Sequence, residues 1–175
     1  MHFLLTDTND DRLNLRPFSH TRPLGLLRNG ILTQCDRWKK YLKVEVVHTL
    51  TADYLKDAFA GPKMLGRGDV LIRSTWVASA GAAKAVYALE PGQVLGLGGQ
   101  ALAVCLDEPM ASSEAEHYLT TALPRVLLMI EPQLILFPWD LFLQAKHIIE
   151  ADFDLVTAGR KSCAVGDANT IVYNP

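Results

Sequence analysis

The chain has 175 residues, of which 49% are hydrophobic and 21% charged, and its formal net charge is -2. These values fit one globular domain that can bury a core without disulfides or metals. They argue against the basic footprint of a nucleic-acid-binding protein and against an acidic, disordered tail.

The chain opens with a strand pattern, a polar stretch and a proline-stiffened segment. Residues 2–6 are apolar and predict a first strand, which ends at Asp7. Residues 8–14 are polar and predict a loop. Residues 16–23 contain two prolines and two arginines. Because proline fixes φ and has no backbone N–H, this stretch predicts a rigid, irregular segment.

A helical pattern follows. Residues 29–42 predict a helix, because apolar side chains at helical spacing share one face: Ile31, Cys35, Trp38 and Leu42. Arg37 falls on the polar side of that helix. The β-branched residues 43–47 predict a strand, and residues 51–56 predict a second helix with Thr51 as its N-cap.

The middle of the chain predicts a strand, a helix and a hairpin. Residues 69–72 are apolar and predict the strand, and the alanine-rich residues 79–89 predict the helix. Residues 93–97 and 101–106 predict two paired strands, because Gly98-Gly99 between them is a hairpin signal.

The last third predicts further helices and strands. Ser112 or Ser113 is expected to cap a helix that runs to residue 123, and residues 125–130 and 134–137 are strand-like apolar runs. Residues 139–150 predict a helix with one apolar face, formed by Phe142, Ala145 and Ile149. Strands that alternate with short helices favour an α/β fold with a mixed, mainly parallel sheet flanked by helices, to which the hairpin adds an antiparallel part.

The cysteines and the hydropathy pattern predict a soluble, cytoplasmic domain. Cys35, Cys105 and Cys163 are far apart and form no C-x-x-C pair, which argues against a disulfide framework or a zinc site. Free cysteines of this kind are usually small buried apolar side chains in a reducing compartment. The apolar stretch of residues 126–142 is interrupted by Glu131, Pro132 and Asp140, so we expect no membrane partner.

A longer pattern begins after the first strand. It has the form T-R-P-x-x-x-L-R-x-G-I-L-T and is matched by Thr21, Arg22, Pro23, Leu27, Arg28, Gly30, Ile31, Leu32 and Thr33. It resembles the divergent bacterial UDP-N-acetylglucosamine diphosphorylase/glucosamine-1-phosphate N-acetyltransferase family. Later stretches are similar to that family too: Leu89-Glu-Pro-Gly, Pro138-Trp-Asp-Leu-Phe, Asp152-Phe153 with Gly159-Arg160, and Asp167-Ala-Asn-Thr.

The resemblance implies a fold, a division of the chain and a reaction. Residues 1–160 would form a nucleotidyltransferase-like domain of the nucleotide-diphospho-sugar transferase type. Residues 161–175 would be a junction at the start of a β-helix acyltransferase domain, which longer relatives carry. The expected reaction transfers a nucleotidyl group from a nucleoside triphosphate, UTP in this family, to a hexosamine-1-phosphate with release of pyrophosphate. The expected cofactor is Mg²⁺.

One departure from the family leaves the metal ligands unknown. Most relatives have Asn-Gly after the third strand, near the place of the metal-binding Asp of ordinary nucleotidyltransferases, whereas this chain has Arg73-Ser74. Asp69 precedes that strand instead of following it. This favours an alternative function, a catalytically degenerate domain that binds sugar nucleotides or serves as a scaffold.

The chemistry of the expected reaction selects Arg22 and Arg28 as the catalytic candidates. Negative charge builds on the transferred group and on the leaving pyrophosphate, and positioned cations stabilise it. Arg22 lies in a loop after the first strand, the edge where α/β sheets bind ligands, and Arg28 lies near the start of the predicted helix, where free N–H groups favour anions. Gly30 could let the backbone approach a ligand closely.

The remaining substrate-binding candidates could also have purely structural roles. Thr21 and Pro23 flank Arg22, and Asp7 could contact nucleotide or metal or cap a loop. Trp139 and Asp140 could hold substrate or begin a helix. The two arginines could instead be surface residues paired with Asp7, Asp10 or Asp11.

Overall fold

A mixed sheet forms the centre of the molecule. The computed structural model describes residues 1–124, 126–127 and 131–161. The strand order of the main sheet is β2-β1-β4-β6-β5-β8, and β3 pairs with β7 in a small second sheet. The bounds of the strands are β1 Phe3–Thr6, β2 His48–Leu50, β3 Met64–Leu65, β4 Val70–Arg73, β5 Val94–Leu97, β6 Gln100–Cys105, β7 Met110–Ala111 and β8 Val126–Leu127.

The strand directions confirm the predicted fold class. β1 runs parallel to β2 and to β4, and β5 runs parallel to β8. β6 is antiparallel to both β4 and β5, and the β5–β6 turn at Gly98 and Gly99 is the predicted hairpin. Since β1, β2 and β4 run in the same direction, their carboxyl ends meet at one edge of the sheet.

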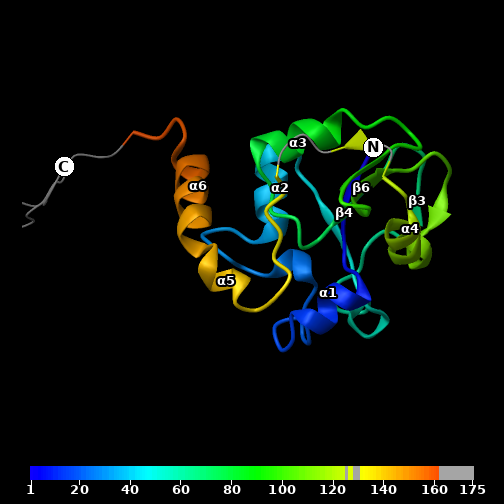
Figure 1. Ribbon diagram of the computed structural model, residues 1–175, viewed down its shortest axis with the longest axis horizontal. Coiled ribbons are helices and arrows are strands. Elements are labelled where there is room, and N and C mark those ends of the chain that lie inside the picture. Colours follow the sequence, from blue (N-terminus) through cyan, green and yellow to red (C-terminus); the bar gives the residue numbers. More distant parts are fainter. Residues whose placement is uncertain (125, 128–130, 162–175) are drawn as a thin grey trace, which may run out of the picture.

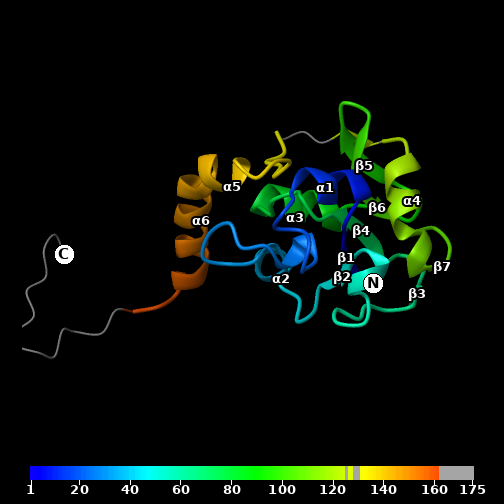
Figure 2. The ribbon, with the colours of Figure 1, turned by 90° about the horizontal axis from the view of Figure 1, so that it is seen from below.

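Helices cover both faces of the sheet, as Figures 1 and 2 show. Their bounds are α1 Asn9–Asn14, α2 Gln34–Leu42, α3 Ala80–Tyr87, α4 Ala115–Thr121, α5 Asp140–Leu143 and α6 Ala145–Thr157, with short 3₁₀ helices at Leu24–Leu26, Asp53–Leu55 and Ser112–Glu114. α5 and α6 follow each other at one side of the molecule (Figure 1). We call them the helical arm.

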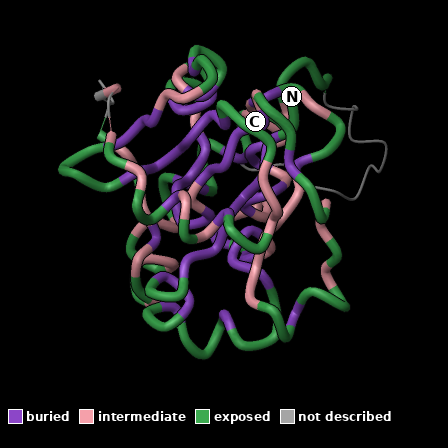
Figure 3. The backbone as a smooth tube through the Cα atoms, turned by 90° about the vertical axis from the view of Figure 1, so that its right-hand side faces the viewer, coloured by how far each residue is buried: buried purple, intermediate pink, exposed green. Residues whose placement is uncertain are grey.

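The core divides between the two faces because successive strand residues point to opposite sides. Phe3 and Leu5 of β1 pack with α2 and α3, in the cluster that also holds Trp38 and Val86. Leu4, from the same strand, packs with α4 on the other face. Figure 3 shows the buried residues along the central strands and the exposed ones mainly in the loops around them.

The predictions about the cysteines and about membrane spans can be compared with the structure. Cys35 and Cys105 are free and buried, as predicted, whereas Cys163 and the predicted junction at 162–175 lie outside the described residues. Within the described ranges, no helix is long and apolar enough to cross a membrane.

Several predicted elements in the first half of the chain were wrong. The polar stretch after Asp7 is helix α1, because Thr8 accepts a hydrogen bond from Asp11 N and caps it. α2 begins at Gln34 instead of residue 29, since Thr33 is its N-cap. The strand predicted at 43–47 lies at His48–Leu50, because Lys43 adopts φ 54° and ends α2.

The predicted helix of residues 51–56 is only the 3₁₀ turn Asp53–Leu55. The Thr51 hydroxyl does not cap it but donates to Asp7. The helix expected from Ser112 or Ser113 begins as the 3₁₀ turn Ser112–Glu114, which has no side-chain cap, and continues as α4.

The C-terminal predictions need correction too. Residues 134–137 form no strand beyond a bridge from Leu134 to Trp76, and of the run 125–130 only Val126–Leu127 is a described strand. The predicted helix 139–150 is two helices, and its buried residues are Ile148 and Asp152, not Phe142 and Ile149. Arg37 is buried as well, at 2% exposure, although the helical pattern placed it on the polar side.

Candidate functional site

A buried ion pair organises the carboxyl ends of β1 and β2. Asp7 follows β1, is 3% exposed and pairs with Arg12 of α1 at 3.0 Å. Its carboxylate also accepts from the Thr51 hydroxyl at 2.7 Å and from the backbone N–H of Leu24. Burial outweighs these hydrogen bonds and the Arg12 charge and raises the pKa of Asp7. Asp7 is therefore fully occupied by groups of this chain.

Arg12 also holds the proline-rich segment. Its guanidinium donates to the carbonyl oxygens of Ser19 and Arg22 and to the hydroxyls of Thr51 and Tyr54. One nitrogen, Nη1, bonds both Arg22 O and Thr51 Oγ1, at 3.4 Å and 2.9 Å. This confirms an ordered, irregular segment, and we call residues 16–28 the arginine loop.

The arginine loop and the helical arm line an open hollow of about 570 Å³. It is lined by Pro17, Phe18, Thr21, Arg22, Leu27, Arg28, Asn29, Gly30, Leu141, Phe142, Ala145 and Ile149, and we call it the arginine cleft. This volume is typical of a small-molecule site. Thr21, Arg22, Arg28 and Gly30 thus come together at one cleft, whereas Asp7 and the buried Pro23 do not line it.

The two arginines of the cleft are free to meet an anion. Both are exposed, and neither forms an ion pair with a carboxylate in the described parts of the chain. Asp7 pairs with Arg12 and Asp11 pairs with Arg73, so the alternative pairings weighed for Arg22 and Arg28 do not form. Arg28 Nη1 donates to Ile31 O. Because no acidic residue is among those that line the cleft, its charge is positive.

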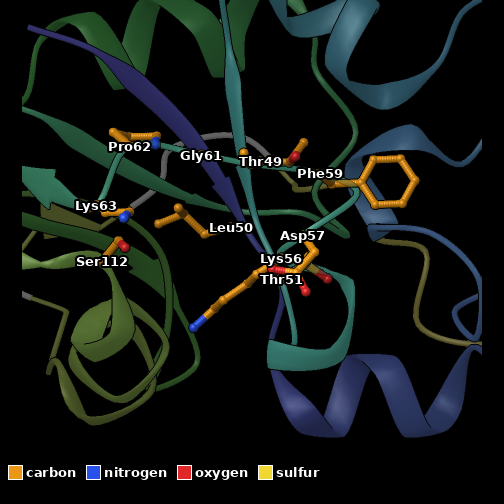
Figure 4. A pocket seen from close by; sticks show the side chains of 11 residues that line it. Thr49, Leu50, Thr51, Lys56, Asp57, Phe59, Gly61, Pro62, Lys63 and Ser112 are labelled. Carbon is orange, nitrogen blue, oxygen red and sulfur yellow. The ribbon is translucent and has the colours of Figure 1, made fainter.

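A second hollow lies at the end of β2 (Figure 4). It has a volume of about 320 Å³, and its polar lining includes Thr49, Thr51, Lys56, Asp57, Lys63 and Ser112. Lys56 pairs with Asp53, and a neighbouring hollow that shares Thr51 and Lys56 reaches Asp7. We call this region the β2 groove. Sequence analysis did not single it out, since Ser112 reaches residues 49–63 only through the antiparallel pairing of β3 with β7.

A buried cluster fastens the helical arm beside the arginine cleft. Asp152 of α6 accepts from Arg37 Nε at 2.7 Å and from Arg37 Nη2 at 2.8 Å. It also accepts from the backbone N–H groups of Ile31 and Leu32. The hydrogen bonds from Arg37 and from this backbone outweigh burial and lower the pKa of Asp152. Asp152 therefore joins α6, α2 and the turn after Arg28.

Gly30 has a packing role that the sequence did not predict. A Cβ built on it would lie 2.6 Å from Asp152 Oδ2 and 2.8 Å from Ile148 Cγ2. Both atoms belong to α6, so the missing side chain lets the helical arm approach the backbone.

We expect Gly30→Ala to destabilise the protein by about 1–3 kcal/mol, because the added methyl group overpacks the contact with α6. Gly66→Ala is the matched control, since its nearest side-chain atom, Asp69 Oδ2, would be 3.7 Å away. Urea unfolding followed by circular dichroism measures both variants. Equal stability of Gly30→Ala and the parent protein would contradict this packing role.

Trp139 and Asp140 do not line the cleft. Asp140 Oδ2 accepts from the backbone N–H groups of Leu136 and Phe137, so its carboxylate holds the turn before α5. Trp139 is 57% exposed and stacks on Phe137 at 4.8 Å. The contacts of Asp140 agree with the helix-start reading.

Two carboxylates at the sheet edge, Asp7 and Asp11, are held by arginines and so are poor ligands for a protein-held Mg²⁺. Asp7 is saturated as described above, and Asp11 accepts from Arg73 Nε and Nη2 at 2.8 Å and 2.7 Å. Mg²⁺ in phosphate-transfer sites usually takes one or two carboxylates together with substrate phosphates. Here arginines hold those carboxylates, and no cluster of three or more His, Cys, Asp or Glu within the described ranges could hold a metal.

Comparison with known families decides the identity of the domain. Residues 3–161 match the family described as sugar nucleotidyl transferase. The chain belongs to this family. The searches of curated proteins and of solved structures found no match.

The match of the sugar nucleotidyl transferase family spans the sheet edge, the arginine loop and the helical arm. Three residues that organise these parts were missed by sequence analysis: Arg12, Asn29 and Arg37. Arg12 lay in a predicted loop and Arg37 on a predicted polar face. For a sugar nucleotidyl transferase the family implies a nucleoside triphosphate and a sugar phosphate as substrates.

Proposed function

We propose that this sugar nucleotidyl transferase domain transfers a nucleotidyl group from UTP to a hexosamine-1-phosphate and releases pyrophosphate. The arginine cleft carries the proposal, because it combines two arginines that have no carboxylate partner among the described residues with a described lining that has no acidic residue. Guanidinium groups offer planar, paired donors to phosphate oxygens.

The reaction needs positioning and charge stabilisation but no covalent intermediate. An oxygen of the sugar phosphate forms a bond to the α-phosphorus of UTP, and the bond from that phosphorus to the leaving pyrophosphate oxygen breaks. Negative charge moves onto the pyrophosphate, where Arg22 and Arg28 would stabilise it. Asp7 and Arg12 do not touch substrate in this proposal. They hold the arginine loop at the sheet edge.

Two substrates need two subsites, and the described part of the chain has two hollows that Arg12 links. Arg12 Nη1 bridges the Arg22 carbonyl of the arginine loop and Thr51 of the β2 groove. The β2 groove adds Lys56, Lys63, Asp57 and the hydroxyls of Thr49, Thr51 and Ser112, and it reaches the carboxyl end of β2, where ligands of α/β sheets commonly bind. The resemblance implies Mg²⁺, yet the donor set described above does not fit it, so no step of this proposal uses a metal.

The test is a coupled assay of pyrophosphate release. We expect release when UTP, glucosamine-1-phosphate or its N-acetyl derivative, and Mg²⁺ are all supplied, and no release when the sugar phosphate is omitted. Running the same reaction with EDTA measures the need for the metal. Absence of pyrophosphate with every sugar phosphate and every nucleoside triphosphate would reject the proposal.

The second candidate function is a domain that binds sugar nucleotides, or serves as a scaffold, without turnover. The pairing of Arg73, at the end of β4, with Asp11 favours it, since ordinary nucleotidyltransferases have a metal-binding Asp near that place. Calorimetry with UTP and UDP-N-acetylglucosamine, with and without Mg²⁺, separates the two functions. Binding that needs no metal, combined with zero turnover, would support the second.

A further inference from the structure

We propose that the helical arm is a dimer interface, at which α6 packs antiparallel against α6 of a second copy of this chain. The interface would be centred on an exposed apolar surface, which we call the arm patch. Its members are Trp139, Phe142, Leu143, Ile149 and Phe153. The association needs neither substrate nor turnover, so it stands apart from the proposed function.

The arm patch gathers exposed apolar side chains in one short stretch of the chain. Its members lie between residues 139 and 153 and are 46–75% exposed. Phe137 stacks on Trp139 beside them. The other large apolar side chains that are exposed in the described ranges, such as Leu13 of α1 and Leu97 of β5, are distributed over different elements and loops. Single exposed apolar residues are normal on a protein surface, whereas a cluster marks an interaction surface.

α6 carries two rows of side chains with the same spacing, and only one of them is covered. The inner row holds Ile148 and Asp152, which are 2% and 1% exposed and pack against the body of the protein. One position later, Ile149 and Phe153 form the outer row. Because successive helix residues are rotated by about 100°, the outer row faces a different direction. The Asp152–Arg37 pair thus fixes the helix and leaves the outer row for a partner.

The outer row has the spacing of a seam between two helices. Phe142 precedes Ile149 by seven residues, and Ile149, Phe153 and Val156 follow one another at intervals of four and three. Knobs-into-holes packing of two helices requires apolar residues at such alternating intervals. α6 has 13 residues and is therefore about 20 Å long. It lies at the outer edge of the described part of the molecule (Figures 1 and 2), where a second helix can approach.

The outer row is self-complementary when the second α6 runs antiparallel. A two-fold axis level with Ala151 would place Ile149 opposite the partner's Phe153, because both residues are two positions from that level. The exposed Lys146 lies in the first turn of α6, and the exposed Asp154 lies toward its other end. An antiparallel copy brings the cationic end beside the acidic end, whereas a parallel copy pairs ends of like charge.

The size of the arm patch suits a dimer. Its three aromatic members are more than half exposed. Since aromatic side chains bury about 150–250 Å² each, the whole patch offers on the order of 500 Å² of apolar surface. A standard interface buries about 800 Å² per partner and is about 60% apolar. The arm patch with a polar rim therefore reaches the area that a stable dimer needs.

The charges of α6 favour a protein partner over a lipid surface. A helix that lies on a membrane usually has a polar face rich in lysine and arginine. α6 exposes Glu150 and Asp154 but only one lysine, Lys146. Anionic lipids would therefore be repelled by most of this helix, whereas a second copy supplies charges of both signs.

Sedimentation velocity of the whole chain, from low micromolar to millimolar concentration, tests the proposal. We expect a monomer–dimer equilibrium. Phe153→Glu should raise the Kd of the dimer about thirtyfold or more, because it puts a charge at the centre of the seam. Leu123→Glu is the matched control, since Leu123 is 76% exposed and follows α4, which lies at the opposite side of the molecule from α6. Circular dichroism checks that both variants keep their fold.

Cross-linking tests the orientation of the two helices. Cys35 and Cys105 are buried, so a Cys163→Ser background suits the experiment. In a mixture of Lys146→Cys and Val156→Cys chains, a short bis-maleimide should link unlike chains more than like chains, because an antiparallel copy places residue 146 level with residue 156. A preference for links between like chains would overturn the antiparallel arrangement.

The remaining outcomes also decide the matter. A chain that stays monomeric over the whole concentration range would overturn the dimer, and so would a dimer that Phe153→Glu leaves intact. Flotation of a monomeric chain with vesicles of phosphatidylcholine and phosphatidylserine would assign the arm patch to a lipid surface instead. None of these measurements involves pyrophosphate release, so a failed transferase reaction and a failed dimer are told apart.

Discussion

Asp152→Ala is expected to lower the free energy of unfolding by about 3–5 kcal/mol, because it leaves the buried Arg37 cation without its carboxylate. Asp152 is 1% exposed and Arg37 2% exposed, so water cannot replace the lost partner. The substitution also frees the N–H groups of Ile31 and Leu32. We expect the helical arm to detach first, since Asp152 and Ile148 are the buried residues of α6.

Urea unfolding followed by tryptophan fluorescence measures this loss. Asp154→Ala is the control on the same helix, because Asp154 is exposed and should change stability by no more than about 0.5 kcal/mol. Hydrogen exchange in α6 would report whether the arm loosens before the sheet. A loss below about 1 kcal/mol would show that Asp152 does not hold the arm.

The Asp152–Arg37 ion pair also makes the stability of the protein depend on pH. Burial is outweighed by the hydrogen bonds from Arg37 and the Leu32 and Ile31 backbone, so the pKa of Asp152 is lower in the folded chain. Its stabilisation is therefore complete above the unfolded pKa of about 3.9 and disappears as pH falls through the folded value. The stability gap between the parent protein and Asp152→Asn should be largest near neutral pH and should shrink in acid.

Arg22→Ala is expected to lower the rate of pyrophosphate release about a hundredfold, by analogy with removal of one preorganised donor to a developing charge. Arg22 is exposed in the arginine cleft, so its truncation opens no cavity in the core. Its carbonyl still accepts from Arg12, and the arginine loop should keep its path. A loss in kcat with little change in KM would place the contact in the transition state.

Matched variants separate charge from position. Arg67→Ala removes an exposed arginine far from the cleft lining and should leave the rate unchanged. Arg22→Lys keeps the charge but not the paired donors, so its rate should lie between the parent and Arg22→Ala. A rate for Arg22→Ala equal to that of the parent would remove Arg22 from the catalytic assignment.

The predicted elements that proved right depend on short-range signals. The β5–β6 hairpin follows from Gly98-Gly99, and α3 follows from the Ser79 cap and its alanines. Other elements lie at different residues from those predicted, because a helix cap or a turn nearby outweighed the average helix or strand propensity of the stretch. Thr8 caps helix α1 where a loop was predicted, Thr33 caps α2 five residues after its predicted start, and Lys43 ends α2 in a left-handed conformation.

Part of the candidate site could likewise be predicted from the sequence, and part of it could not. The grouping of Thr21, Arg22, Arg28 and Gly30 could be predicted, because these residues lie within ten positions of one another in one pattern. The cleft itself could not, because its other wall comes from α5 and α6. Asp7 was placed correctly at the end of β1, but its partner is Arg12, which only helix α1 brings within reach.

By itself the sequence determined the α/β class, the hairpin, the buried cysteines of the described core and the arginine pattern, since local periodicity and turn chemistry encode them. Only the tertiary structure decided which charges pair and which remain free. Asp152 and Arg37 are 115 residues apart, and their pairing holds α6 against Gly30. Such choices depend on burial and distance in the folded chain, which no spacing along the sequence expresses.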